Sequence, residues 1–171
     1  TGSSVSENSA PDESGRGGGI YTVTGSVTVA DSTVHGNASG DNGGGIFSTF
    51  CSVTLPDSTV SGNNSGGDGG GNFSESSSVT LVTSTVRANV AGTVSNSSGG
   101  GISTNSGAVT LTQSTISQNV AVFSGGGISA IAGSVSLIRS TVTRNSTTGF
   151  SNGGGGIYAN SASVTVVASA V

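Results

Sequence analysis

One motif recurs along this chain: a glycine triplet with an isoleucine, a Val-Thr-Val block, and a Ser-Thr-Val-x-x-Asn block. Its first full copy is 17–37, GGGIYTVTGSVTVADSTVHGN, and further copies open near residues 43, 69, 99, 125 and 154. A repeat that fills nearly a whole chain leaves few folds open, because each copy takes a similar shape and packs on its neighbours. We therefore interpret 1–171 as a single repeat domain, with 1–16 as a partial first copy.

The spacing of the copies indicates a solenoid. The valine of the second block recurs at steps of 26, 26, 30, 26 and 29 residues, and the third block keeps the same steps. The distance between these two blocks is therefore fixed. The differences in length fall between the asparagine that ends one copy and the glycines that open the next. Insertions confined to one corner are typical of a solenoid.

The blocks themselves read as short β-strands. They alternate apolar with hydroxylated residues and are rich in β-branched types. No segment carries a sustained 3.6-residue apolar period, and glycine recurs too often for helices to persist. The sequence predicts an all-β fold: a parallel β-helix, or β-solenoid, of about six rungs of 26–30 residues with three short strands each.

Stacked rungs would turn each repeated position into a column. Rungs are spaced by about 4.8 Å, and a single rung cannot bury its own valines. We expect inward columns through the Val-Thr-Val block and through Val34 and its equivalents. A further inward column contains Ile20, Ile46, Asn72, Ile102, Ile128 and Ile157. Asn72 interrupts it, which predicts either a weak point or a shift that lets Phe73 cover the gap.

An asparagine follows three residues after the inward valine of every copy. Stacked asparagines can hydrogen-bond along a solenoid axis and satisfy turn amides, which predicts a structural ladder. Three members lie in N-x-Ser/Thr sequons, so a glycan-carrying role is the alternative for Asn37, Asn63 and Asn145. The predicted ladder is Asn8, Asn37, Asn63, Asn89, Asn119 and Asn145.

The glycine triplets are predicted to form tight corners with positive φ. None of them matches the phosphate-binding P-loop pattern, which requires a lysine, because the chain has no lysine.

Hydroxyl side chains are expected to line the outside. We expect two columns: one between the paired inward residues of the Val-Thr-Val block, and a second formed by Thr33, Thr59, Thr85, Thr115 and Thr141. A plain polar strand face, O-glycosylation and ice binding are all compatible with such columns. The first column, between paired inward residues, is Thr28, Thr54, Thr80, Thr110, Ser136 and Thr165.

Charge and composition exclude some partners. The net charge is −4 and the four arginines are scattered, so we expect no nucleic-acid binding. No apolar run reaches the roughly 18 residues of a membrane span, so we expect no membrane insertion of this segment. Few charges and many hydroxyls favour an extracellular or cell-surface location. The single Cys51 reads as an incidental small residue, with a reactive or intermolecular thiol as the alternative.

The chain has few residues of the types that enzymes use for catalysis. His35 is the only histidine, and all eight carboxylates lie between Glu7 and Glu75. Asp31 and Asp57 share a column, yet no second functional group accompanies them, as a polysaccharide-cleaving enzyme would need. Aspartates before two glycine triplets, at 41 and 68, could hold a loop cation, but the calcium-binding nonapeptide is missing. We predict no enzyme, no cofactor, and no catalytic or metal site.

The two ends of the chain fall in the same block and show no polar cap. Two explanations are open: the sequence is a piece of a longer array, or copies self-associate end to end. A contact that does not close produces a fibre, so we predict an extracellular structural protein, a filament subunit. The alternative is a surface adhesin or a glycan- or ice-binding module. The residues expected at the assembly ends are Ser3, Ser4, Val5, Ser169, Ala170 and Val171.

The pairing of the two outer blocks resembles a known family. Gly44-Gly45-Ile46 with Val60-Ser61-Gly62-Asn63 is similar to the GGxI and VxxN blocks of polymorphic outer-membrane proteins and autotransporter-type adhesins. The resemblance covers about residues 3–171, with Val or Ile where that family often has Phe. It implies a right-handed parallel β-helix displayed outside the cell, and it identifies no ligand.

Overall fold

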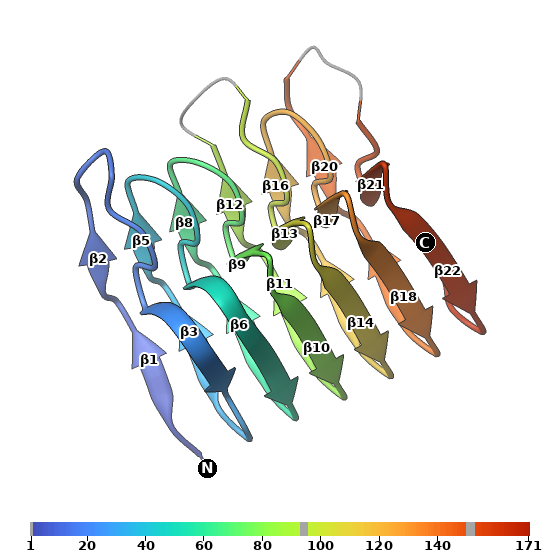
Figure 1. Ribbon diagram of the computed structural model, residues 1–171, viewed down its shortest axis with the longest axis horizontal. Helices are drawn as coiled ribbons and strands as arrows, with labels where there is room; N and C mark the ends of the chain where they lie inside the picture. Colours follow the sequence, from blue (N-terminus) through green and yellow to red (C-terminus); the bar gives the residue numbers. More distant parts are fainter. Residues whose placement is uncertain (1, 93–95, 150–152) are drawn as a thin grey trace.

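The chain folds as a β-solenoid of about six turns (Figure 1). The structure is a computed structural model and describes residues 2–92, 96–149 and 153–171. Over these ranges the regular structure consists of parallel strands, and no helix occurs. The predicted all-β parallel β-solenoid, with about three strands per rung, is confirmed.

The Ser-Thr-Val blocks form the first sheet. Its central residues, such as Val34, Val60 and Val86, are Cα partners and lie buried against the core. The sheet consists of β1 (Ser4–Ser6), β4 (Thr33–His35), β7 (Thr59–Ser61), β11 (Thr85–Arg87), β15 (Thr115–Ser117) and β19 (Thr141–Thr143).

The two residues that follow each ladder asparagine form a second, narrow sheet. Its inward positions carry small residues, among them Ser65, Ala91 and Ala121. The sheet consists of β2 (Ser9–Ala10), β5 (Ala38–Ser39), β8 (Asn64–Ser65), β12 (Val90–Ala91), β16 (Val120–Ala121) and β20 (Ser146–Thr147).

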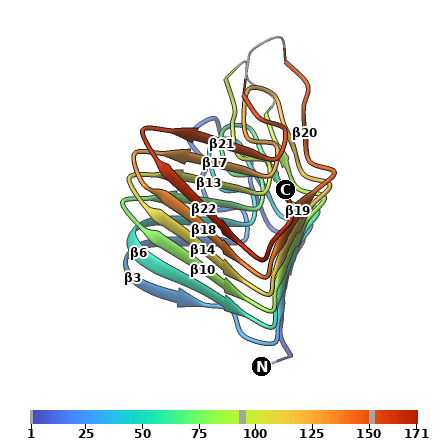
Figure 2. The same cartoon turned by 90° about the vertical axis from the view of Figure 1, so that its right-hand side faces the viewer.

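The isoleucine and Val-Thr-Val blocks together form the third sheet. Two of its strands, β3 (Ile20–Thr28) and β6 (Ile46–Pro56), continue through the corner between these blocks. Later coils divide there, and Figure 2 shows β13, β17 and β21 above β14, β18 and β22. The divided strands are β9 (Asn72–Glu75), β10 (Ser78–Val82), β13 (Ile102–Asn105), β14 (Ala108–Thr112), β17 (Ile128–Ile131), β18 (Ser134–Ile138), β21 (Ile157–Asn160) and β22 (Ser163–Val167).

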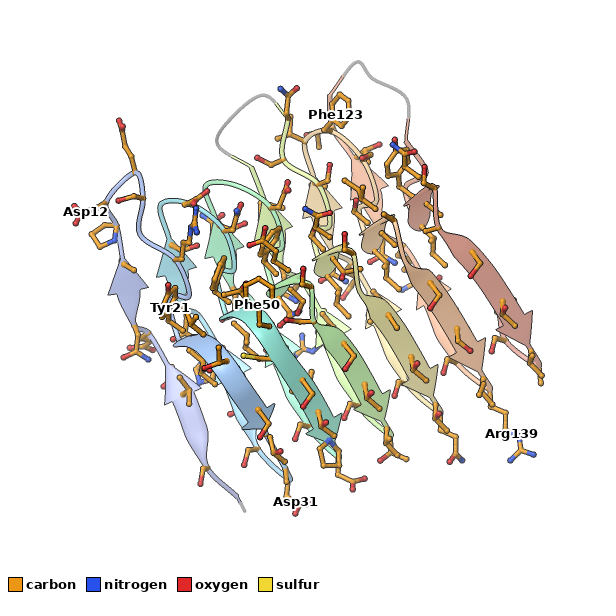
Figure 3. The ribbon with its side chains drawn as sticks, in the orientation of Figure 1. Asp12, Tyr21, Asp31, Phe50, Phe123 and Arg139 are labelled. Atoms are coloured by element: carbon orange, nitrogen blue, oxygen red, sulfur yellow. The ribbon has the colours of Figure 1, made fainter. Side chains whose placement is uncertain are left out.

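Residues with positive φ make the corner between the third and first sheets. Asp31 has φ 47° and Arg139 has φ 50°, and Figure 3 shows both side chains at the same edge, directed away from the sheets. Asp57 occupies this corner in the second coil, where its carboxylate accepts a hydrogen bond from the Thr83 hydroxyl. These aspartates therefore lie at an outer turn.

The core runs the length of the stack and is thin in cross-section. Each inner coil contributes aliphatic side chains such as Ile46, Val53, Leu55 and Val60, whose exposed fractions are 0–1%. The equivalent of Val53 in the last coil is Val164, which is 44% exposed. Burial of one coil thus depends on the coil that stacks next to it.

Asn72 remains in the isoleucine column. It is the Cα partner of Ile46 and Ile102, and it is 1% exposed. Its Nδ2 donates to Ser74 Oγ at 2.8 Å. Phe73 stays in the neighbouring column opposite Phe47, so the prediction that Phe73 could cover the gap is wrong. The strand keeps its register because a one-residue slip would turn every side chain to the opposite face.

Candidate functional site

The six predicted asparagines form a continuous hydrogen-bonded row. Asn63 shows the pattern: its Nδ2 donates to Asn89 Oδ1 at 2.9 Å, and its backbone N–H donates to the same oxygen at 3.0 Å. The second Nδ2 proton goes to the Val34 carbonyl of the preceding coil at 3.0 Å. The same side-chain contact, at 2.9–3.0 Å, links Asn8, Asn37, Asn63, Asn89, Asn119 and Asn145 in sequence.

These contacts bear on the glycan-carrying alternative. Asn37 and Asn63 are 1% and 0% exposed, and both protons of each carboxamide are already donated. A buried amide nitrogen that is fully hydrogen-bonded cannot carry a bulky surface glycan. The ladder is therefore the role of these two side chains in the fold. Asn145, in the last ladder position, is half-buried.

The glycine triplets and the asparagines are sterically coupled. A Cβ on Gly45 would lie 2.6 Å from the Gly71 carbonyl oxygen and 3.0 Å from Asn63 Cγ, and a Cβ on Gly71 would meet the Gly101 carbonyl oxygen and Asn89 Cγ at 2.6 and 3.1 Å. The third glycine of a triplet thus leaves room for the amide row. Positive φ, predicted for the triplets, holds for the first glycine of five of them, with values of 59–70°. A side chain at this position would disturb both the next triplet and the amide row.

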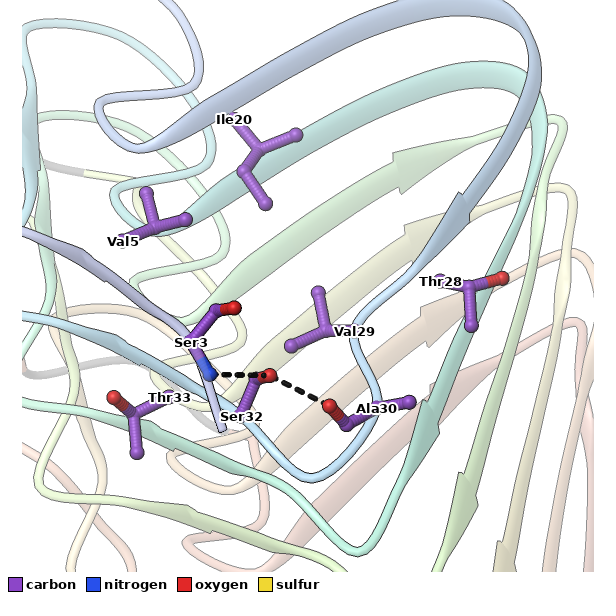
Figure 4. Close-up of a pocket in the computed structure, with 8 residues that line it drawn as sticks. All are labelled: Ser3, Val5, Ile20, Thr28, Val29, Ala30, Ser32 and Thr33. Atoms are coloured by element: carbon purple, nitrogen blue, oxygen red, sulfur yellow. Dashed lines mark hydrogen bonds between the residues drawn. The ribbon is translucent and has the colours of Figure 1, made fainter. Parts of the chain in front are cut away.

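A second polar ladder, which the sequence reasoning missed, runs through the serine before each Thr-Val pair. The backbone N–H of Ser58 donates to Ser84 Oγ at 2.9 Å, while Ser58 Oγ donates to the Pro56 carbonyl at 2.8 Å. Figure 4 shows its N-terminal end, where Ser3 N–H donates to Ser32 Oγ. The invariance of this serine is the sequence signal. The accepting hydroxyls are Ser32, Ser58, Ser84, Ser114, Ser140 and Ser169.

The predicted hydroxyl columns lie on the outer faces. Thr54, Thr80 and Thr110 are Cα partners on neighbouring strands and are half-buried. In each strand this threonine alternates with two buried aliphatic residues, so the column faces outward. Ser136 and Thr165 continue this column toward the C-terminus, and Thr28 begins it. The second column, Thr33, Thr59, Thr85, Thr115 and Thr141, is likewise aligned on the first sheet.

Asp41 and Asp68, the aspartates before two glycine triplets, are engaged in contacts between coils. Arg16 Nε lies 2.7 Å from Asp41 Oδ2, and Ser98 N–H donates to Asp68 Oδ1 at 2.7 Å. Burial raises the pKa of Asp68; the hydrogen bond from Ser98 opposes this effect, and the charge of Asp41 adds to it. Within 2–92, 96–149 and 153–171, no group of three or more His, Cys, Asp or Glu side chains is placed to hold a metal ion.

The two remaining candidates for chemistry lie apart from each other. His35 is half-buried in β4, aligned with Ser6 and Ser61 on the outer face of the first sheet. Cys51 is buried in β6, and its Sγ lies 3.0 Å from the Thr49 carbonyl. Within the part of the chain that the structure describes, neither contacts a second group that could form a catalytic pair with it.

Fold and ladders together define a β-solenoid repeat protein. Comparisons with protein-family models, with curated proteins and with solved structures gave no match for this chain. Among the described residues, no helix has the length and hydropathy of a membrane span.

Proposed function

We propose that the chain is an extracellular structural protein, a filament subunit whose copies stack head to tail. The polarity of the asparagine row supports this most directly. Each ladder amide donates to the coil that follows it in sequence. Among the described residues, Asn8 Oδ1 accepts no hydrogen bond and Asn145 N–H donates none. A second copy stacked on the last coil would bring Asn8 over Asn145 and extend the row.

The apolar columns at the two ends support the same arrangement. The last coil presents Val164 and Val166, which are 44% and 47% exposed. The first coil presents the half-buried Val5 and Ile20 around a depression of about 260 Å³, together with Val29, the equivalent of Val166, which is 8% exposed (Figure 4). Stacking would place the apolar residues of the last coil on those of the first coil of the next copy, and it would cover the open strand edges of both.

One adjustment accompanies such a contact. Ala170 forms a parallel bridge with Thr141, at the level that β1 of an incoming copy would occupy. We infer that 169–171 and the first residues of the next copy compete for this level, and that one of the two is displaced.

Electron microscopy tests the filament proposal. Purified chain at increasing concentration should form unbranched filaments. Val166→Lys, which places a charge in the apolar end, should leave short rods, while Thr165→Lys on the outer face of the same strand should form filaments as before. Monodisperse rods of the unchanged chain at high concentration would overturn the proposal, and so would filaments of Val166→Lys that match the wild type.

A surface adhesin of the autotransporter type is the second candidate. Its support is the resemblance of the GGxI and VxxN blocks, together with outer faces that carry hydroxyls in register. A blank screen against glycans and host surface proteins would count against it.

Ice binding by the same hydroxyl face is an alternative that an absence of thermal hysteresis would rule out. We infer no catalytic role for the chain, so cleavage of a polysaccharide that Asp31→Asn or Asp57→Asn abolishes would contradict this inference.

A further inference from the structure

Phe50 departs from the repeat at a corner that every other full coil fills with a smaller residue. It occupies a corner of the third sheet with φ 52°, and its side chain is 66% exposed. A bulky residue in the left-handed region is strained. Because the Phe50 ring is exposed, hydrophobic burial does not offset this strain. The other coils place small residues with positive φ at this corner: Thr24, Ser76, Ser106, Ala132 and Ser161. Strain of this kind is a reason to look for a function.

A second exposed ring lies on the adjoining strand. Tyr21 in β3 is 56% exposed and stacks on Phe47 of β6, with ring centroids 5.2 Å apart and planes 10° from parallel. Tyr21 is the Cα partner of Phe47, and Phe50 follows Phe47 by three residues along β6. The exposed rings of Tyr21 and Phe50 are therefore offset by about 10 Å along the strand direction. Val23, 47% exposed, lies between them. Figure 3 shows Tyr21 and Phe50 on these two strands.

The Tyr21 ring ends a row of stacked rings that runs along the solenoid axis. Phe47 stacks in turn on Phe73, at 5.5 Å between centroids. The Arg16 guanidinium lies 5.2 Å from the Phe47 ring centroid and is paired with Asp41 at 2.7 Å. Hydrogen bonding to Asp41 raises the pKa of Arg16, and the nearby Tyr21 and Glu75 add to this effect. The cation of this region is thus already neutralised.

Hydrogen-bonding groups border the rings. Glu75 is half-buried, lies opposite Thr49 in the register, and forms no ion pair or side-chain hydrogen bond with another described residue. Its carboxylate can accept hydroxyl protons from a ligand. Thr24 and Ser76 occupy the corner on either side of Phe50 and supply further hydroxyls.

We propose that Phe50, Tyr21 and Glu75 form a binding site for a neutral glycan. The C–H face of a pyranose packs on an exposed aromatic ring, while its hydroxyls donate to a carboxylate and exchange hydrogen bonds with threonine and serine. Three exposed apolar side chains are too few for a stable protein interface, which buries about 800 Å² on each partner. An acidic glycan would find a carboxylate and no uncommitted cation. A filament stack would cover the free edge of β3 and with it Tyr21, so the site is tested on the Val166→Lys chain, which is expected not to stack.

NMR titration of the ¹⁵N-labelled Val166→Lys chain tests the site, with the further variants made in the same background and with cellohexaose, chitohexaose and mannohexaose as separate probes up to about 10 mM. At least one probe should shift amide signals around Phe50 and Tyr21. Phe50→Ser, which introduces the residue of three other coils, should weaken binding by about tenfold or more while thermal stability is retained or increased.

Phe123→Ser is the matched control, because Phe123 is a half-buried aromatic on a loop remote from the rings (Figure 3). It should leave the titration unchanged. Glu75→Gln should weaken binding less than Phe50→Ser, since an amide oxygen still accepts a hydrogen bond. No shift with any of the three probes would overturn the proposal, and so would equal binding by Phe50→Ser and the Val166→Lys parent chain.

Discussion

Asn63 donates its side-chain amide to Asn89 in the next coil at 2.9 Å, and both side chains are 0% exposed. Each buried amide of this row thereby satisfies the turn of one coil and the side chain of the next. The stack is joined by side-chain ladders as well as by strand pairing, and these buried polar groups make specific demands on the residue type.

Replacing one ladder asparagine should be costly. Asn89→Ala removes the acceptor of two Asn63 donors and the donor to the Val60 carbonyl. Each buried group left unpaired costs about 1–3 kcal/mol, so we expect a loss of about 3 kcal/mol or more in urea unfolding. Asn64→Ala, at an exposed position of β8, should change stability by less than about 0.5 kcal/mol. Equal effects of the two substitutions would contradict the ladder's role.

The serine row should behave in the same way with a smaller magnitude. Ser84→Ala deprives the Ser58 N–H of its acceptor in a buried corner. We expect a loss of about 1–3 kcal/mol by urea unfolding. Ser78→Ala, on the exposed face of β10, serves as the control and should be nearly neutral. A Ser84→Ala protein as stable as the wild type would show that water replaces the hydroxyl.

The interrupted isoleucine column should be repairable. Among the described residues Asn72 Oδ1 has no hydrogen-bond partner, and Asn72 Nδ2 donates to Ser74 Oγ, which also contacts Ser48 Oγ at 2.8 Å. Asn72→Ile removes an unsatisfied buried group and adds apolar contact with Ile46 and Ile102. We expect a gain of about 1–3 kcal/mol in unfolding free energy. Ile102→Asn is the reverse experiment and should destabilise; a loss of stability in Asn72→Ile would refute the prediction.

Asp68 should make stability fall as pH rises. Its folded-state pKa is raised above the ordinary value of 3.8, chiefly by burial, so the folded state disfavours the charged form. This contribution to stability is full below the unfolded pKa and is lost as pH rises through the folded pKa. Asn42 already supplies an amide oxygen to Asp68 N–H at 2.7 Å in the neighbouring coil, so an asparagine at 68 should make the equivalent bond to Ser98.

Thermal unfolding between pH 3 and pH 7 measures this effect. Asp68→Asn should match the wild type at the acid end, where Asp68 is protonated, and exceed it at neutral pH. The difference should grow as pH rises through the folded pKa. A variant that is less stable than the wild type at pH 7 would show that the charged hydrogen bond to Ser98 outweighs burial.

The period of the sequence made the architecture predictable, because fixed steps between blocks place like residues in columns. The serine row was missed because a serine beside Thr-Val reads as an ordinary strand residue, and only the structure shows which hydroxyls turn back to the backbone. Phe73 was misjudged since register outweighs the benefit of covering one polar residue. Phe50 carries no periodic signal, because it departs from the repeat in one coil alone.

Disulfide trapping tests the head-to-tail stack most directly. In a Cys51→Ala background, Thr28→Cys and Thr165→Cys introduce thiols at the two ends of one hydroxyl column, five coils or about 24 Å apart within a copy. Stacked copies would bring these positions to about 4.8 Å, within the Cα range of a disulfide. Oxidation should yield a ladder of covalent multimers, whereas Thr28→Cys with Thr80→Cys should yield none. Absence of multimers from the end-to-end pair, or equal multimers from both pairs, would contradict the stacked filament.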